Sequence, residues 1–274
     1  VSKVLNNNGV IAIDMDENKE YVILGKGVGF GKKVSQRFDK PEGCTTYRLE
    51  QETERGSAKE LVKGIEPEYL EIADAILTES QKVFGDSIDR GILFPLADHI
   101  SFAVARIRRN EQISNPLTED IKVLFYSEFK VAETLKTILR ERLQIEIDDH
   151  EVGYVALHIH SAIGDEKVSV AMQTARAVRE CIDMIEKATG KPIDVLSLSY
   201  NRLMNHMKYM VARASTGEKL NLDMNEYMLD QYPQAYKVAT DICKNLEGCI
   251  GHNLDETETG YLAMHIQRVY KDAV

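Results

Sequence analysis

The sequence has few cysteines and no long apolar run. Its four cysteines form no Cys-x-x-Cys pair and give no disulfide framework. No apolar stretch approaches the roughly 18 residues that a membrane-spanning helix needs. The first residues, VSKVLNNNGVIAI, lack the architecture of a signal peptide. These absences predict a protein of the reducing cytoplasm that does not insert into a membrane.

The net charge of −10 is spread unevenly along the chain. Residues 1–60 contain ten basic and ten acidic residues, so the whole negative excess lies in the remainder. An acidic surface repels nucleic acid, whereas a neutral or mildly basic one does not. Any polyanionic partner is therefore expected at the N-terminal segment.

Three blocks of the chain align with later blocks at one common offset of 107 residues, without a gap. DHISFAVAR (98–106) aligns with NHMKYMVAR (205–213), and FYSEFKVA (125–132) with YPQAYKVA (232–239). DDHEVGYVALHI (148–159) aligns with DETETGYLAMHI (255–266). Three matches in one register predict two copies of a domain of roughly 100 residues.

The two copies show helical periodicity, and the N-terminal segment does not. Apolar residues in LADHISFAVARI follow the spacing of an amphipathic helix, and residues 65–85 and 168–190 are amphipathic stretches that end at glycine. Before residue 50, short apolar runs at 10–14, 21–25 and 45–49 alternate with turn-rich DENK and DKPEG. We therefore predict a multidomain protein, with a small antiparallel β domain at 1–55, a linker at 56–66, and homologous all-α helical-bundle domains at 67–170 and 171–274.

The loop GKGVGFGKK (25–33) resembles two nucleotide-binding motifs without satisfying either. A dinucleotide fingerprint must lead into a helix, and a phosphate loop needs Ser or Thr after its Gly-Lys. Here KVSQRFDKPEG follows, which predicts no helix, and Lys33 stands where Ser or Thr is needed. The loop is then either a plain glycine-rich β turn or a surface for RNA. Glycine allows close backbone approach, Phe30 can stack on an unpaired base, and lysines can hold phosphates.

The run Asn6-Asn7-Asn8 precedes a predicted strand. It can be a simple turn, because asparagine tolerates positive φ. Alternatively, its amides can donate and accept hydrogen bonds at base edges. The residues alone do not distinguish the turn from the RNA contact.

Four histidines recur at matched positions, namely His99 and His158 in the first copy and His206 and His265 in the second. A single histidine on a semi-apolar stripe is usually a satisfied core residue. Zinc is another alternative because acidic residues lie near, although the four histidines form no close HxxxH or HxxE pair. The unrepeated histidines, at 150, 160 and 252, are interpreted as ordinary local residues.

Together, KVLNNN, GKGVGFGKK and the paired DHISFAVAR and GYVALHI phrases resemble the bacterial transcriptional antiterminators of the BglG/SacY/LicT type. The resemblance covers the whole chain in order, and the loop and ALHIHSA are most similar to the glucose-system members. It implies a dimeric β domain that binds a hairpin in the leader of a sugar-operon transcript and prevents termination. It also implies two helical regulation domains that the sugar phosphotransferase system phosphorylates on histidine.

The resemblance assigns RNA contacts to six positions of the β domain. Lys26 departs from the arginine frequent in relatives and lacks its bidentate fork, so the RNA preference is expected to differ. The six residues are Lys3, Asn6, Asn8, Gly25, Lys26 and Phe30.

The resemblance assigns phosphorylation to His99, His158, His206 and His265. A phosphoryl group adds close to two negative charges, which neighbouring carboxylates repel and arginines steady. If the histidines line a dimer interface, phosphorylation would rearrange it. The neighbours expected at these sites are Asp98, Arg106, Glu151, Arg213, Glu258 and Arg268.

The implied partners are a leader mRNA hairpin, the phosphocarrier HPr, a sugar-specific permease component and a second copy of the chain. The chain is expected to be a regulator and not an enzyme, with no cofactor, catalytic residue or metal. Two alternatives remain: a DNA-binding activator with the same regulatory domains, which needs a helix-turn-helix, and a metal-dependent enzyme with a duplicated helical core.

Overall fold

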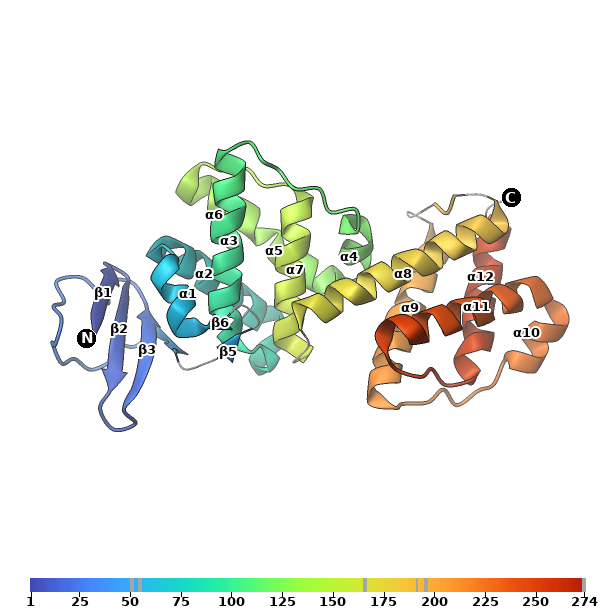
Figure 1. The fold of residues 1–274 in the computed structure, drawn as a ribbon, viewed down its shortest axis with the longest axis horizontal. Helices are drawn as coiled ribbons and strands as arrows, with labels where there is room; N and C mark the ends of the chain where they lie inside the picture. Colours follow the sequence, from blue (N-terminus) through green and yellow to red (C-terminus); the bar gives the residue numbers. More distant parts are fainter. Residues whose placement is uncertain (50–51, 54–55, 165–166, 191, 195–196, 273–274) are drawn as a thin grey trace. The chain divides into compact units, whose positions relative to one another are not determined.

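The computed structural model describes residues 1–49, 52–53, 56–164, 167–190, 192–194 and 197–272. The expected end of the β domain at residue 55 lies outside these residues. The chain divides into two compact units (Figure 1). Unit 1 holds residues 1–115 and 127–168, and unit 2 holds residues 116–126 and 169–274.

Unit 1 begins with a four-stranded antiparallel sheet in the order β1-β2-β3-β4. Val10 and Ala12 pair with Ile23 and Tyr21, so their side chains share one face, where they form a cluster with Val28. Residues 22 and 47 pair on the opposite face, as the two-residue period of strands requires. The strands are β1 (Lys3–Asn6), β2 (Gly9–Asp14), β3 (Lys19–Leu24) and β4 (Thr45–Arg48).

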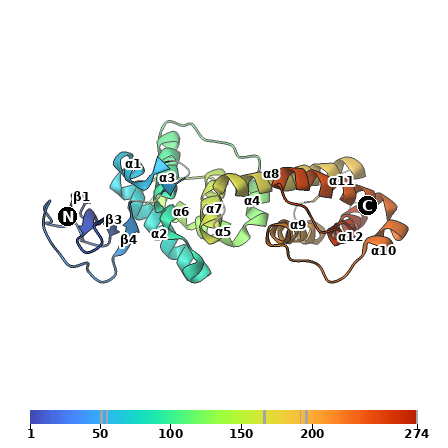
Figure 2. The ribbon, with the colours of Figure 1, turned by 60° about the horizontal axis from the view of Figure 1, so that its bottom comes forward.

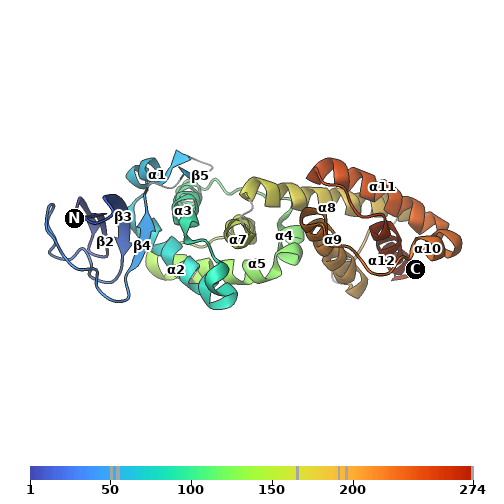
Figure 3. The same ribbon diagram turned by 90° about the horizontal axis from the view of Figure 1, so that it is seen from below.

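The sheet packs against the helices of unit 1 through β4. Figures 2 and 3 show β4 next to α2, and the Tyr47 ring lies edge-on to Phe94 of α3 at 6.4 Å. This burial supplies the support that a small sheet lacks alone. The predicted class, a small β domain followed by helical domains, is confirmed. The helices of unit 1 are α1 (Ala58–Gly64), α2 (Pro67–Phe84), α3 (Leu93–Arg108), α5 (Tyr126–Ala132), α6 (Thr134–Leu143) and α7 (Asp149–Gly164).

Residues 56–66, expected as a linker, contain structure of their own. A short strand pair joins β5 (Glu52–Thr53) to β6 (Gly56–Ser57), and helix α1 follows directly. Ser57 caps α1 by accepting a hydrogen bond from the Glu60 amide at 3.3 Å. Two 3₁₀ turns, η1 (Gly85–Ser87) and η2 (Arg90–Ile92), connect α2 to α3.

The internal repeat is visible in the helix bounds. Shifting α4 (Thr118–Leu124) by 107 residues gives α10 (Asn225–Gln231), and α7 falls on α12 (Thr257–Asp272) within one residue. Helix α11 (Pro233–Ile250) runs unbroken where the first copy is divided at Glu133 into α5 and α6. Helices α8 (Val168–Thr189) and α9 (Leu198–Thr216) complete the second copy. Within the described residues, no helix is both long enough and apolar enough to cross a membrane.

Candidate functional sites

The asparagine turn and the glycine loop form one surface. The Gly27 amide donates to Asn8 Oδ1 at 3.0 Å. The Gly25 and Gly29 amides donate to the main-chain oxygens of Asn8 and Asn7, both at 2.9 Å. Three hydrogen bonds therefore fix the loop onto the β1–β2 hairpin, and two motifs that are separate in the sequence become one site.

The close approach explains two of the glycines. A Cβ atom on Gly29 would lie 2.0 Å from the main-chain oxygen of Asn6, and one on Gly25 would lie 2.3 Å from the Cys44 sulfur. Real Cβ atoms do not come so near, so glycine is required at both positions. Gly27 also has φ of +74°, a left-handed conformation that favours glycine.

The loop presents an aromatic ring and cations to solvent. Phe30 is 73% exposed, and Lys3 and Lys26 are exposed beside the half-buried Asn6 and Asn8. A large exposed aromatic ring is available for stacking. Lys32 lies over the Phe38 ring, 4.8 Å from its centroid, and is thus engaged within the loop.

The side-chain amides of Asn6 and Asn8 make hydrogen bonds within the chain. Asn6 Oδ1 accepts from the Asn8 amide at 2.8 Å, and Asn8 Oδ1 accepts from Gly27. Only the side-chain nitrogens point to other groups, and both donate to Glu71 of α2, at 2.7 and 3.2 Å. Each carbonyl oxygen thus holds one hydrogen bond of the turn, and both nitrogens are held by Glu71. The sequence carried no signal of the contact with Glu71.

The first helical copy brings His99 of α3 and His158 of α7 together. Their ring centroids lie 5.3 Å apart, and the Tyr154 ring lies 5.6 Å from His99. His99 Nε2 is 3.3 Å from Glu151 Oε2, and Arg106 donates to the other oxygen of that carboxylate at 2.8 Å. Both histidines and Glu151 are buried.

The second copy repeats this arrangement on α9 and α12. The rings of His206 and His265 stack with centroids 4.7 Å apart. His206 Nε2 faces Glu258 at 3.6 Å. Arg213 binds Glu258 through two hydrogen bonds, at 2.6 and 2.9 Å, in the bidentate geometry that guanidinium favours.

Burial keeps the imidazoles of the second site neutral. It lowers the pKa of His206 to about 3, with further contributions from His265 and Arg213. Burial also lowers the pKa of His265 to about 4, and the positive charge of Arg268 contributes. Neutral imidazole keeps a nucleophilic lone pair at neutral pH.

Each site also holds a buried carboxylate. Burial acts to raise the pKa of Glu151, but its contacts with His99 and Arg106 outweigh it and leave this pKa below its ordinary value. Glu258 is 1% exposed and bound by Arg213. The pairing of these glutamates with Arg106 and Arg213 was not predicted from the sequence, although the matched spacing in both copies could have indicated it.

The remaining expected neighbours are Arg268 and Asp98. Arg268 is exposed on α12 and influences His265 by charge. Asp98 precedes His99 on α3 and is half-buried. Among the described residues, no group of three or more His, Cys, Asp or Glu side chains is arranged to hold a metal ion. Nothing in this geometry therefore favours the metal-enzyme alternative.

Two family models match the chain. The CAT RNA binding domain matches residues 1–56, and the PRD domain matches residues 74–162 and again 179–269. The two PRD matches fall on the two copies of the repeat, and each contains one histidine pair.

Known relatives match along nearly the whole length. The GlcA/glcB genes antiterminator of Staphylococcus carnosus is 30% identical over 97% of this chain and 94% of its own. LicT, a transcription antiterminator of Bacillus subtilis, is 27% identical over 100% of this chain and 99% of its own. A crystal structure of GlcT CAT-PRDI is 29% identical, with a TM-score of 0.52, and covers 60% of this chain and 97% of that chain.

Proposed function

We propose how the residues of this chain act in antitermination. The chain belongs to the transcriptional antiterminators that join a CAT RNA-binding domain to two PRD domains. The CAT domain binds a hairpin in the leader of a sugar-operon mRNA and thereby prevents termination. The PRD domains regulate this binding through phosphate carried on histidine. The chain acts in the cytoplasm, where the transcript is made.

The RNA surface consists of the glycine loop and the asparagine turn. Phe30 stacks on an unpaired base, and Lys3 and Lys26 bind phosphates. Asn6 and Asn8 donate from their side-chain nitrogens to acceptors on the RNA, while Gly25 keeps the backbone close to the turn. The single observation that carries this assignment is the attachment of the loop to the turn by three hydrogen bonds.

A second copy of the chain completes the binding unit. A groove of about 1190 Å³ lies along one face of the sheet, beside residues 34–40. Ile13, Met15 and Val34 line this groove, and they are 43%, 71% and 64% exposed. Apolar groups exposed together on a small domain indicate an interaction surface, and packing of a second CAT domain would cover them.

The histidine pairs accept the phosphoryl group. The donors are HPr and a sugar-specific permease component, each of which carries phosphate on histidine or cysteine. The P–N or P–S bond of the donor breaks as a P–N bond to imidazole forms, and the imidazole N–H proton passes to the donor. His99, His158, His206 and His265 are the acceptors.

Phosphorylation disturbs the buried glutamates. A dianion on His99 would face the Glu151 carboxylate, which lies 3.3 Å from His99 Nε2. Like charges at this distance repel strongly in a buried site. Arg106 would then exchange Glu151 for the phosphate, and Arg213 would exchange Glu258 in the second domain, so the contacts between α3 and α7, or α9 and α12, must change.

Gel-shift titration of the full chain against leader RNAs of sugar-permease operons from its own genome tests the RNA assignment. The glcA leader of S. carnosus serves as an outside reference. We expect one hairpin to bind tightly and the Phe30→Ala variant to bind at least 10-fold more weakly. Equal binding to all RNAs, or no effect of Phe30→Ala, would refute the assignment.

Phosphorylation is tested with purified phosphocarriers and mass spectrometry under conditions that preserve phosphohistidine. Each of the four histidines is replaced by Ala in turn, with His252→Ala as the control, because His252 is exposed and unrepeated. Phosphate should disappear from the altered site only. Undiminished incorporation after all four replacements would overturn the proposal.

The described part of residues 1–57 consists of strands and turns, so no observation favours a DNA-binding activator.

A further inference from the structure

Two acidic residues of α2 contact the sheet at different places. Glu71 and Asp74 lie three residues apart and so project from one side of the helix. Glu71 accepts hydrogen bonds from the side-chain nitrogens of Asn6 and Asn8. Asp74 accepts from residues of β4. Helix α2 continues into the first PRD match, which begins at residue 74, so the helix that contacts Asn6 and Asn8 also belongs in part to a regulatory domain.

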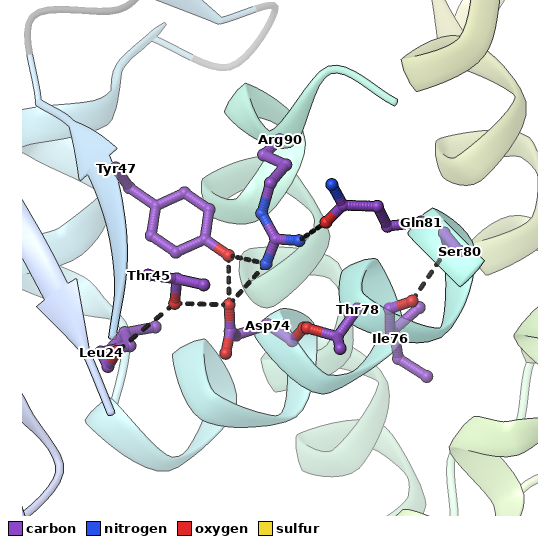
Figure 4. A network of polar contacts seen from close by, with 9 residues as sticks. All are labelled: Leu24, Thr45, Tyr47, Asp74, Ile76, Thr78, Ser80, Gln81 and Arg90. Atoms are coloured by element: carbon purple, nitrogen blue, oxygen red, sulfur yellow. Dashed lines mark hydrogen bonds and ion pairs between the residues drawn. The ribbon is translucent and has the colours of Figure 1, made fainter. Parts of the chain in front are cut away.

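The Asp74 contacts attach β4 firmly to α2 (Figure 4). Its Oδ1 atom accepts from Thr45 Oγ1 at 2.9 Å, from the Tyr47 hydroxyl, and from Arg90 Nη2 at 2.8 Å. Arg90 also donates to the Tyr47 hydroxyl at 2.7 Å and to Gln81 Oε1 at 2.8 Å. Burial and the charge of Asp74 raise the pKa of Tyr47, so it remains a neutral donor.

The Glu71 contact engages the groups that the proposed RNA site needs. The oxygens of Asn6 and Asn8 each accept one hydrogen bond within the turn, whereas the turn leaves their side-chain nitrogens for a ligand. Both nitrogens now donate to one carboxylate, Oε1 at 2.7 Å and Oε2 at 3.2 Å. Glu71 is 17% exposed, and Arg142 lies 3.4 Å from its Oε2 atom.

We propose that Glu71 is an autoinhibitory ligand of the CAT domain. Its carboxylate occupies the position of an RNA acceptor, so that the asparagine nitrogens bind either Glu71 or RNA. The carboxylate also places negative charge where the phosphate backbone approaches, which opposes RNA entry. This inference rests on the proposed function, because it requires that Asn6 and Asn8 contact RNA.

The proposal has a quantitative consequence. If only a fraction of molecules has Glu71 released, the apparent dissociation constant for RNA equals the intrinsic one divided by that fraction. Replacing Glu71 removes the competing acceptor and raises the fraction toward one. We expect Glu71→Ala to bind RNA about 5–30-fold more tightly than the unaltered chain, which corresponds to a released fraction of roughly 3–20%. Glu71→Gln keeps an acceptor but loses the charge, and its affinity should lie between the two.

The experiment measures RNA affinity of the full chain by fluorescence anisotropy with the leader RNAs described above. Glu79→Ala is the matched control. It removes the same charge from the same helix, but Glu79 pairs with Lys82 within α2 at 2.6 Å. A second measurement records the side-chain amide resonances of Asn6 and Asn8 without RNA. These should shift in Glu71→Gln and stay unchanged in Glu79→Ala.

The outcomes separate this proposal from the one on which it rests. Tighter binding by Glu71→Ala, with shifted asparagine resonances, supports the inference. If the unaltered chain binds a hairpin and Glu71→Ala binds it no better, the autoinhibitory role is refuted while the RNA function stands. Unmoved resonances would likewise refute the contact. If no variant binds any hairpin, the proposed function fails and the inference falls with it.

Discussion

Gly29 must be glycine because its α-carbon contacts a residue that is distant in the sequence. Its α-carbon lies against the backbone of Asn6, where a Cβ atom would approach the main-chain oxygen to 2.0 Å. The backbone cannot yield there without breaking the bond from the Gly29 amide to Asn7. The glycine loop is therefore shaped by contact, and its conformation depends on the hairpin beneath it.

We expect Gly29→Ala to lower the stability of the CAT domain by about 1–3 kcal/mol, as strained substitutions typically do. RNA binding should weaken with it, because Phe30 and Lys26 lose their positions. Thermal unfolding and gel-shift measure the two effects. Gly64→Ala is the control, since no atom lies within 4 Å of its added Cβ. A Gly29→Ala chain that melts and binds normally would contradict the packing described here.

The half-buried histidines of the second PRD domain predict a pH effect. Folding lowers the pKa values of His206 and His265 to about 3 and 4. The unfolded chain, with values near 6.5, therefore binds more protons at mildly acidic pH. The folding stability that the neutral histidines contribute is fully present above about pH 6.5. It is lost as the pH falls toward the folded-state pKa values of about 4 and 3. At pH 5 the loss is at most about 2 kcal/mol per histidine.

Hydrogen exchange of α9 and α12 amides, measured between pH 5 and 8 and corrected for the intrinsic rate, tests this effect. Protection should decrease as pH falls below 6.5. A chain with His206→Gln and His265→Gln should lose most of that dependence. Protection that is independent of pH in the unaltered chain would show that these imidazoles are not buried as described.

At the scale of elements, the two PRD domains are assembled around an arginine–glutamate pair. Arg213 of α9 holds Glu258 of α12 with two hydrogen bonds, and their side chains are 14% and 2% exposed. Removing one partner from a buried pair leaves the other charge without compensation. The pair therefore joins two helices that also carry His206 and His265.

We expect Glu258→Gln to destabilise the second PRD domain by about 3 kcal/mol. Glu79→Gln breaks an exposed pair within α2 and should cost less than about 1 kcal/mol. Chemical denaturation of the two variants against the unaltered chain gives the comparison. Equal effects of the two substitutions would mean that the α9–α12 pair contributes no more than a surface ion pair.

The sequence predicted elements better than the contacts between them. Helical and strand periodicity located α2, α3, α8 and the sheet, because apolar spacing is set locally. The division of α5 from α6 at Glu133 was not predicted, since both copies carry the same Lys-Val-Ala phrase there. The matched positions of the histidines followed from the repeat, whereas the approach of His99 to His158 within one copy did not. The Glu71 contact joins residues more than 60 positions apart, and neither spacing nor propensity reports such a tertiary contact.

At the scale of the whole molecule, the CAT domain and the PRD domains differ in net charge. The net charge of −10 arises outside residues 1–60, which are neutral overall. The PRD domains are thus unsuited to RNA, and in the proposed RNA surface the positive charge comes from local cations such as Lys3 and Lys26. If only a few of these cations contact phosphate, affinity should depend on salt with a modest slope, because each phosphate contact releases counterions.

We expect Lys26→Ala to lower the slope of log K against log salt by about 1, with weaker binding to every RNA tested. Lys82→Ala, which removes an exposed cation of α2, should leave the slope unchanged. Anisotropy titrations from 50 to 300 mM salt supply the values. An unchanged slope for Lys26→Ala would place this lysine outside the phosphate contacts.

The two histidine sites are built from the same residue types in nearly the same geometry. The interior residues alone would therefore not allow a phosphocarrier to distinguish one site from the other. Discrimination must then reside at the rim. There, one turn beyond the first histidine of each pair, Phe102 and Tyr209 occupy matched positions and are 53% and 60% exposed. For the phosphorylation proposed here, exchanging Phe102 and Tyr209 should change how fast one carrier phosphorylates each domain, which mass spectrometry would measure.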